Sequence, residues 1–326
     1  MKKILFFAAL MFFVFPLSAD FLAGEEAFAN KRYSEAMQHF RPLADSGDDR
    51  AQYYVGYMYL NGYGVTRNNA LGLQYMQKSL DQNYHLAQAY MGFLYHEGQV
   101  VPVDYKRSVA LYERAADQGN VSASLNLALA YYLGDGVPRN LAKAIELLEK
   151  VPVEQQPSAG RYLGDIYLAQ DAENMERAIA AYNSAAIEGD LASYVSLAEI
   201  YLQGQGVEQD TERGVKYYRY AASQKYAPAQ YALGVMYVNG VGVGRDSVLG
   251  HAWLTCASNQ NYEPAKDALN QLKSEMTLTD LDLARQKYMD IQNTVLGRVV
   301  SPIEEERKML EAERSQTHKQ VRRKRR

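Results

Sequence analysis

The sequence of 326 residues contains one cysteine, one tryptophan and five histidines. A single cysteine, Cys256, excludes an intramolecular disulfide, and its position excludes lipid attachment at an N-terminal cleavage site. No two histidines lie four residues apart, so the helical spacing typical of zinc ligands is absent; they are His39, His85, His96, His251 and His318. The motifs H-E-x-x-H, G-x-S-x-G and the Walker glycine–lysine loop are also absent. The sequence therefore favours a non-catalytic protein without metal or cofactor.

Only one long apolar run occurs, and it lies at the N-terminus. Lys2 and Lys3 precede the run Ile4 to Phe15, which Pro16 ends shortly before Ala19. Because a membrane-spanning helix needs about 20 residues, this pattern predicts a secretory signal peptide over 1–19. The alternative is an uncleaved membrane anchor. We expect an exported protein, most simply periplasmic, with secretion as the other destination.

Net charge is small, −3, and it is unevenly distributed. A net charge of −3 predicts no nucleic-acid partner for the body of the protein. The C-terminal eight residues, in contrast, contain six basic side chains and no acidic one: Lys319, Arg322, Arg323, Lys324, Arg325 and Arg326. This cluster predicts attachment to an anionic membrane surface or envelope polymer, and a solvated tail without a partner is the alternative.

One pattern recurs six times along the chain. An alanine or serine is followed by an apolar residue four positions on, then by a small residue, and then by tyrosine three positions later. The copies are spaced 36 residues apart, except for one step of 34; they start at Ala51, Ala87, Ala123, Ala159, Ser193 and Ala229. A fixed period of this length is the signature of a repeat architecture.

Each copy predicts two helices. Positions 1, 5, 8 and 9 of the first helix fall on one buried stripe. Glycine turns such as Gly62 to Val65 follow in most copies, and then a residue suited to cap the second helix: Asn68, Asp104, Asn140, Asp210 or Asp246. Because two helices alone cannot bury both faces, the copies must stack, and the fold class is all-α.

The run Ala-x-x-x-Leu-Gly-x-x-Tyr-x-x-Gly-x-Gly-Val resembles the Sel1-like repeat, which is related to the tetratricopeptide repeat. The resemblance implies a right-handed α-solenoid of stacked helix-turn-helix repeats. After the signal peptide, the expected parts are an N-terminal capping hairpin, six repeats, C-terminal capping helices with a cap at Thr279 or Asp280, and a charged tail. They span residues 20–50, 51–264, 265–297 and 298–326.

Two places depart from the pattern. Val100 replaces the second turn glycine in the second copy, and Ala169 to Ala172 lack both glycines and are two residues shorter. Pro152 and Pro157 interrupt the second helix of the preceding copy. We therefore expect the superhelical path to change between residues 150 and 175.

Positions 3, 7 and 10 of the first helices point away from the buried stripe, and most are apolar or aromatic. The resemblance implies that first helices line the concave face, which accepts partners. We therefore predict a groove for a protein or peptide partner, formed by Tyr53, Tyr57, Leu60, Phe93, His96, Leu129, Tyr132 and Tyr231. The alternative is that neighbouring repeats cover these side chains.

The leading functional prediction is a non-catalytic interaction scaffold of the bacterial cell envelope. The alternative from another class is an enzyme or enzyme regulator with a hydrolase-like site, cell-wall or β-lactam related, in the groove. A branch of the family that binds penicillin or β-lactams carries a disulfide in each repeat. With one cysteine, this sequence is not expected to share that activity.

Overall fold

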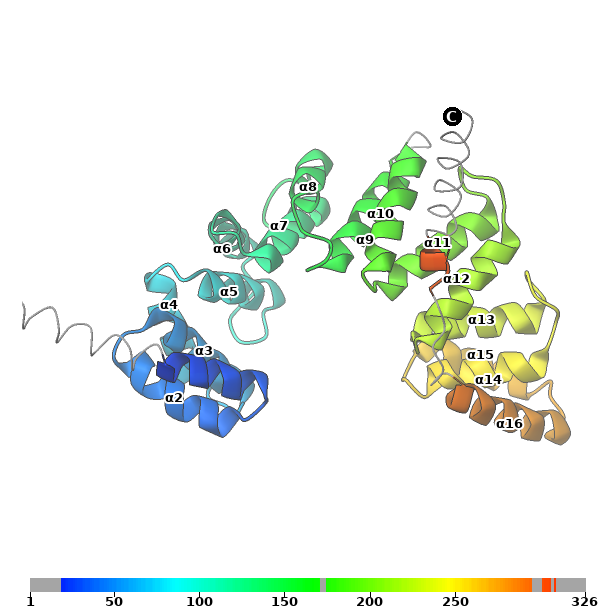
Figure 1. Cartoon of the computed structure of the whole chain (residues 1–326), viewed down its shortest axis with the longest axis horizontal. Helices are drawn as coiled ribbons and strands as arrows, with labels where there is room; N and C mark the ends of the chain where they lie inside the picture. Colours follow the sequence, from blue (N-terminus) through cyan, green and yellow to red (C-terminus); the bar gives the residue numbers. More distant parts are fainter. Residues whose placement is uncertain (1–18, 171–173, 295–300, 306–307, 309–326) are drawn as a thin grey trace, which may run out of the picture. The chain divides into compact units, whose positions relative to one another are not determined.

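The computed structural model describes residues 19–170, 174–294, 301–305 and 308. Within these residues the regular structure is helical and contains no β-strand, so the predicted all-α class is confirmed. The helices follow one another as stacked pairs of a Sel1-like α-solenoid (Figure 1). The chain forms two compact units, residues 1–151 (unit 1) and 152–326 (unit 2). No helix in the described part of the chain combines the length and apolarity needed to cross a membrane.

Unit 1 begins with a helix over residues 19–29, which is followed by α2 (Tyr33–Asp45). Three further pairs follow, in which each first helix packs on the second helix of its own repeat. They are α3 (Asp49–Asn61) with α4 (Asn69–Asp81), α5 (His85–Glu97) with α6 (Tyr105–Asp117), and α7 (Val121–Leu133) with α8 (Leu141–Leu148).

Unit 2 repeats this arrangement and ends with two additional helices. The pairs are α9 (Pro157–Leu168) with α10 (Met175–Ile187), α11 (Leu191–Gln203) with α12 (Thr211–Ser223), and α13 (Ala227–Asn239) with α14 (Ser247–Ser258). The additional helices, α15 (Glu263–Lys273) and α16 (Leu278–Thr294), both pack against α14.

Side-chain caps fix where the second helices begin. Asn68 accepts a hydrogen bond from the backbone N–H of Leu71, and Asp104 does the same for Arg107, which satisfies an N–H that lacks an intrahelical partner. All five predicted caps are confirmed, since Asn140, Asp210 and Asp246 act in the same way. At α16 the prediction was wrong: Thr277 Oγ1 accepts from the N–H of Asp280, 3.2 Å away, so Thr277 occupies the cap position.

The turn glycines set how closely successive repeats approach. Gly64 has φ +66°, and a Cβ there would lie 2.5 Å from the backbone carbonyl carbon of Tyr33, at the start of α2. Gly136, φ +77°, meets the backbone of Tyr105 in the same way, at the start of α6. The second turn glycine therefore provides both the left-handed conformation and the room for the preceding repeat.

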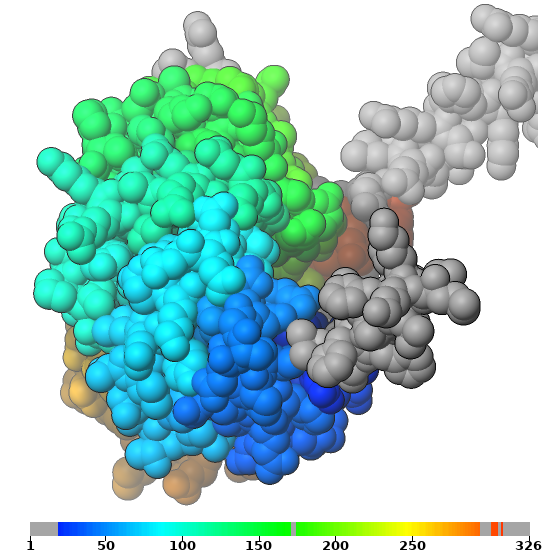
Figure 2. Space-filling model, turned by 90° about the vertical axis from the view of Figure 1, so that its left-hand side faces the viewer, coloured from blue at the N-terminus to red at the C-terminus, as the bar shows by residue number. Residues whose placement is uncertain are grey.

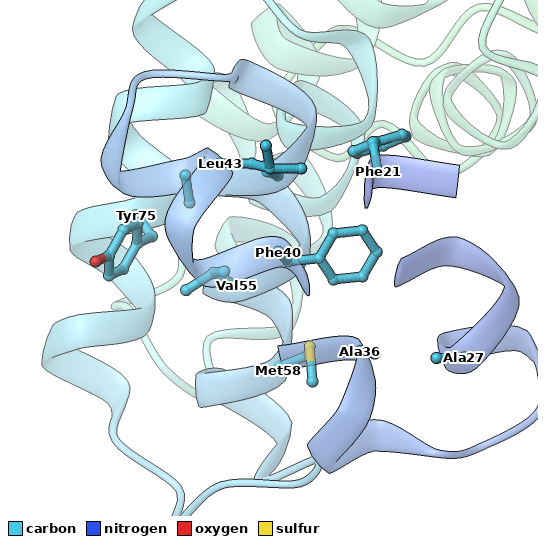
Figure 3. Close-up of a cluster of buried hydrophobic side chains, with 10 residues drawn as sticks. Phe21, Ala27, Ala36, Phe40, Leu43, Val55, Met58 and Tyr75 are labelled. Carbon is cyan, nitrogen blue, oxygen red and sulfur yellow. The ribbon is translucent and has the colours of Figure 1, made fainter. Parts of the chain in front are cut away.

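The core of the N-terminal part of unit 1 is a continuous apolar cluster. The ring of Phe40 is fully buried and points toward the helix that carries Phe21 and Ala27, with Val55 and Met58 of α3 nearby (Figure 3). Figure 2 shows the blue surface of these first helices directly beside the cyan surface of the next repeat. Burial of such side chains, each contributing about 1.5–3 kcal/mol, stabilises the stack without disulfides.

The two prolines coincide with the boundary between the units. The helix α8 has eight residues, whereas most others have thirteen, and α9 begins at Pro157, which occupies its first helical position. Proline is favoured there because the first N–H needs no intrahelical partner. The predicted interruption of the second helix is confirmed, while the predicted change of superhelical path stays a prediction.

Candidate protein-binding surface

Six aromatic rings form a connected surface on unit 1, which we call the aromatic cluster: Phe28, Tyr33, Tyr57, Tyr63, Tyr90 and Phe93. Tyr33 and Tyr63 stack with ring centroids 4.7 Å apart. Tyr57 lies 5.8 Å from Tyr63 and 4.9 Å from Tyr90. Tyr90 in turn stacks on Phe93 at 6.0 Å, so the rings connect three successive repeats. Such pairs add about 0.5–1.5 kcal/mol each beyond their buried area.

The predicted groove residues differ in exposure. Phe93 is 41% exposed, whereas Tyr57 and Tyr53 are half-buried. Burial, followed by the neighbouring tyrosines, raises the pKa of the Tyr53 hydroxyl well above its ordinary value. The expectation that all three residues are exposed was therefore wrong for the two tyrosines, because Tyr84 and Tyr90 of the next repeat pack against Tyr53.

Leu60 does not belong to the surface. It is 3% exposed and lies in a core cluster with Met76 and Met91. A Cβ added at Gly72 would lie 2.7 Å from Leu60 Cγ, so the glycine on α4 makes room for this side chain. Position 10 of the first helix therefore faces the second helix of its own repeat in this copy.

The surface becomes polar beyond Phe93. His96 Nε2 lies 3.5 Å from a carboxylate oxygen of Asp135, and His96 Nδ1 lies 3.1 Å from Glu97. The side chains of His96 and Asp135 are 35% and 32% exposed, so water screens this pair. Leu129 and Tyr132 are half-buried, and the Arg139 guanidinium lies 5.8 Å from the Tyr132 ring. At His96 the predicted groove is therefore polar.

In unit 2, Tyr231 lines a separate pocket of about 370 Å³. Val235 and Val238, which occupy the other two outward positions of α13, line it as well, together with Gln271 and Leu272 of α15. Positions 3, 7 and 10 of α13 therefore line a pocket. On the repeat before it, Glu199 of α11 accepts a hydrogen bond from Tyr218, 3.3 Å away.

Two features of the surface were not predicted. Tyr63 lies inside the glycine turn, and Tyr90 lies at position 4 of its first helix. Position 4 is one helical turn before position 7, so Tyr90 and Phe93 share a face. That spacing could have indicated Tyr90, whereas nothing in the sequence pattern singled out Tyr63.

The single cysteine is a core residue. Cys256 is buried on α14, and burial raises the pKa of its thiol to about 11. Gln292 of α16 covers it, with Nε2 3.5 Å from the sulfur. The described residues contain no group of three or more His, Cys, Asp or Glu side chains that could hold a metal ion. The predicted basic cluster, Lys319 to Arg326, lies outside the described residues.

Comparison with known proteins identifies the repeat. The model of the Sel1 repeat matches five segments, which together cover just over half of the chain: 49–84, 85–120, 121–150, 191–226 and 227–262. Residues 151–190, which include α9 and α10, fall between matched segments. The family model thus matches five of the six predicted repeats, and the remaining one corresponds to the helix pair α9 and α10.

Two solved structures resemble this chain. A Sel1 repeat protein from Oxalobacter formigenes is 25% identical over 73% of this chain and 96% of that one, with a TM-score of 0.65. A protective antigen present in uropathogenic Escherichia coli strains, displaying an SLR fold, is 25% identical over 87% and 72%, with a TM-score of 0.50. The repeat period, the stacked helix pairs and the five matched segments agree, and the chain belongs to the Sel1 repeat family.

Proposed function

We propose that this Sel1 repeat scaffold binds a protein or peptide partner through the aromatic cluster of unit 1. The observation that carries the proposal is the connected run of rings that ends at the exposed Phe93. Aromatic residues supply most hot spots in protein interfaces, because they bury much area with few rotatable bonds. An exposed ring held by stacked neighbours is already ordered, so binding sacrifices little side-chain entropy.

The two ends of the cluster favour different parts of a partner. Near Tyr57 and Phe93 the surface offers rings, which suit an apolar or aromatic anchor side chain. At His96 and Asp135 it offers two solvated polar side chains, which suit a polar rim contact. A peptide that lies along the first helices would place its apolar anchor at Phe93 and its polar residues toward Asp135.

The test compares Phe93→Ala with Val241→Ala in the full chain. Val241 is an exposed apolar residue at a turn of unit 2 and is not part of the aromatic cluster. Once a partner has been captured and purified, calorimetry should show that Phe93→Ala weakens binding by about tenfold or more, the scale of a hot spot. Val241→Ala should leave affinity unchanged. Equal affinities of the two variants would remove the cluster from the interface.

We also propose that the protein acts in the cell envelope, which rests on the N-terminal apolar run and the basic C-terminal cluster. Deletion of 319–326 should weaken binding to anionic vesicles, and the binding of the full chain should fall with salt. Salt-independent binding that is equal with and without these residues would contradict the role of the cluster.

A further inference from the structure

A second surface lies on the second-helix side of unit 2 and is distinct from the aromatic cluster. A pocket of about 590 Å³ lies between α12, α14 and α16. Leu249, Trp253 and Ile291 form apolar parts of its wall. Lys216, Arg219 and Lys287 bring three basic side chains to its lining, and Asp290 brings one acidic side chain.

The chain's own C-terminal segment occupies the edge of this pocket. Pro302 and Glu305 line it, and Ser301 and Ile303 are only 7% and 6% exposed. The hydroxyls of Tyr194 and Ser301 are 2.6 Å apart, and Lys216 Nζ lies 3.0 Å from a carboxylate oxygen of Glu305. In Figure 1 this segment is the short red helix beside α11 and α12. We call residues 301–305 the docked segment.

The repeat pattern is altered where the docked segment binds. In the first helices α3, α5 and α13, the residue after the first position of the repeat is a buried glutamine. It accepts a hydrogen bond from a glutamine 30 residues later. These pairs are Gln52 with Gln82, Gln88 with Gln118, and Gln230 with Gln260, at 2.7–2.8 Å. At α11 this position is Tyr194, whose hydroxyl bonds to Ser301, while the corresponding Gln224 bonds to Ser223.

The contacts of the docked segment define the chemistry that this surface accepts. A proline and an isoleucine are buried, a serine bonds to Tyr194, and a following glutamate pairs with a lysine. Two basic side chains of the pocket remain for further acidic groups. Arg219 donates to the Tyr237 hydroxyl, and neither Arg219 nor Lys287 has an ion pair with a described residue. The surface is therefore complementary to an acidic segment that carries an apolar anchor.

We propose that this pocket is a second protein-docking site, which takes an acidic peptide segment of a partner with a proline–aliphatic pair followed by glutamates. The docked segment is the occupant supplied by the chain itself, and a partner displaces it. The contacts that hold it are few enough for exchange: the buried residues Ser301, Pro302 and Ile303, one hydroxyl pair and one ion pair. Both side chains of that ion pair are close to half exposed, so it stabilises the segment little.

The test measures whether the segment competes with a peptide in trans. A fluorescently labelled synthetic peptide, Ser-Pro-Ile-Glu-Glu, is titrated with the full chain and with Ile303→Asp, and binding is followed by anisotropy. A tethered occupant competes at high effective concentration, so we expect the variant to bind the peptide at least about tenfold more tightly than the unaltered chain. Glu305→Lys is a second release variant that leaves the buried isoleucine in place and should act in the same direction.

Two controls identify the site. Lys216→Glu, added to Ile303→Asp, should reduce the gain, because it places a carboxylate opposite the last glutamate of the peptide, and the peptide Ser-Pro-Asp-Lys-Lys should not bind to any variant. Equal affinity of the peptide for the full chain and both release variants would overturn the proposal. Unfolding of unit 2 in both release variants would overturn it too, since the segment would then be part of the core rather than an exchangeable occupant.

Discussion

Single residues determine how closely the repeats approach. The second turn glycine adopts a positive φ and at the same time lies against the preceding repeat, as Gly64 does against Tyr33. Gly119 also has a positive φ, +83°, but a Cβ there would meet no atom within 4 Å. Gly119 therefore needs glycine only for its positive φ, whereas Gly64 needs it both for its positive φ and for the space that a Cβ would fill.

Gly64→Ala should destabilise the protein more than Gly119→Ala. The left-handed conformation costs an alanine about 1–2 kcal/mol at either site. At Gly64 the Cβ also collides with backbone, which a side-chain rotation cannot relieve. Melting temperatures followed by circular dichroism should fall for both variants and clearly further for Gly64→Ala. An equal decrease would show that the stack of repeats tolerates a displacement at this turn.

His251 makes the stability depend on pH. Its Nε2 is buried without a hydrogen-bond partner among the described residues. Burial, and then the charge of Lys273, lower the pKa of His251 below its ordinary value of 6.5. The unfolded chain consequently binds the proton first as the pH falls. The contribution of this residue to stability is complete above about pH 6.5 and is lost as the pH decreases toward the folded-state pKa.

The pH effect can be isolated by comparing the protein with His251→Phe. Between pH 7.5 and pH 5 the urea midpoint of the unaltered protein should fall more than that of the variant. The comparison removes the contributions of the other histidines, which both proteins share. The same decrease in both proteins would show that His251 does not gain charge on unfolding.

At the scale of the element, neighbouring first helices share their outward side chains. Tyr57 of α3 contacts Phe28 of the first helix and Tyr90 of α5, at ring distances of 6.1 and 4.9 Å. Phe93 of α5 is more exposed and stacks on Tyr90 of its own helix. On this outward face, Tyr57 therefore holds neighbouring repeats together, whereas Phe93 is free to contact a partner.

Tyr57→Ala and Phe93→Ala should differ in stability. Removal of the half-buried Tyr57 ring should cost about 2 kcal/mol, less than the 3–5 kcal/mol typical of a fully buried ring. Phe93→Ala should cost less than about 0.5 kcal/mol, as at most surface positions. Differential scanning calorimetry should show a lower melting temperature for Tyr57→Ala. A large decrease for Phe93→Ala would show that Phe93 is core rather than free surface.

The elements themselves could be predicted from the sequence, because helix periodicity and capping depend on neighbours in the chain. The five caps from Asn68 to Asp246 are local in this sense, and all are confirmed. The burial of Tyr53 and Leu60 could not be predicted, because it depends on contacts between helices. Tyr53 is covered by Tyr90 of the next repeat, and Leu60 packs into the space left by Gly72 of the facing helix. The docked segment was expected to be part of a charged tail. Its contact with the repeats could not be predicted, since Ser301 and Tyr194 are 107 positions apart and no periodicity indicates such a contact.

At the scale of the whole molecule, the chain consists of two units, and each has its own surface. Unit 1 presents the aromatic cluster, and unit 2 presents a basic and apolar pocket on its second-helix side. The surfaces differ in chemistry, so they suit different segments of one partner or two different partners. A scaffold that holds two proteins needs such a separation, since binding at one surface then leaves the other free.

The most direct test of the account is photo-crosslinking from Phe93 in living cells. A benzophenone amino acid replaces Phe93 in one strain and Val241 in another, and irradiated adducts are identified by mass spectrometry. The account predicts a discrete protein adduct from position 93 that weakens when Tyr57→Ala is added, and no such adduct from position 241. Absence of an adduct at position 93, or the same adduct from both positions, would contradict the claim that the aromatic cluster binds a partner.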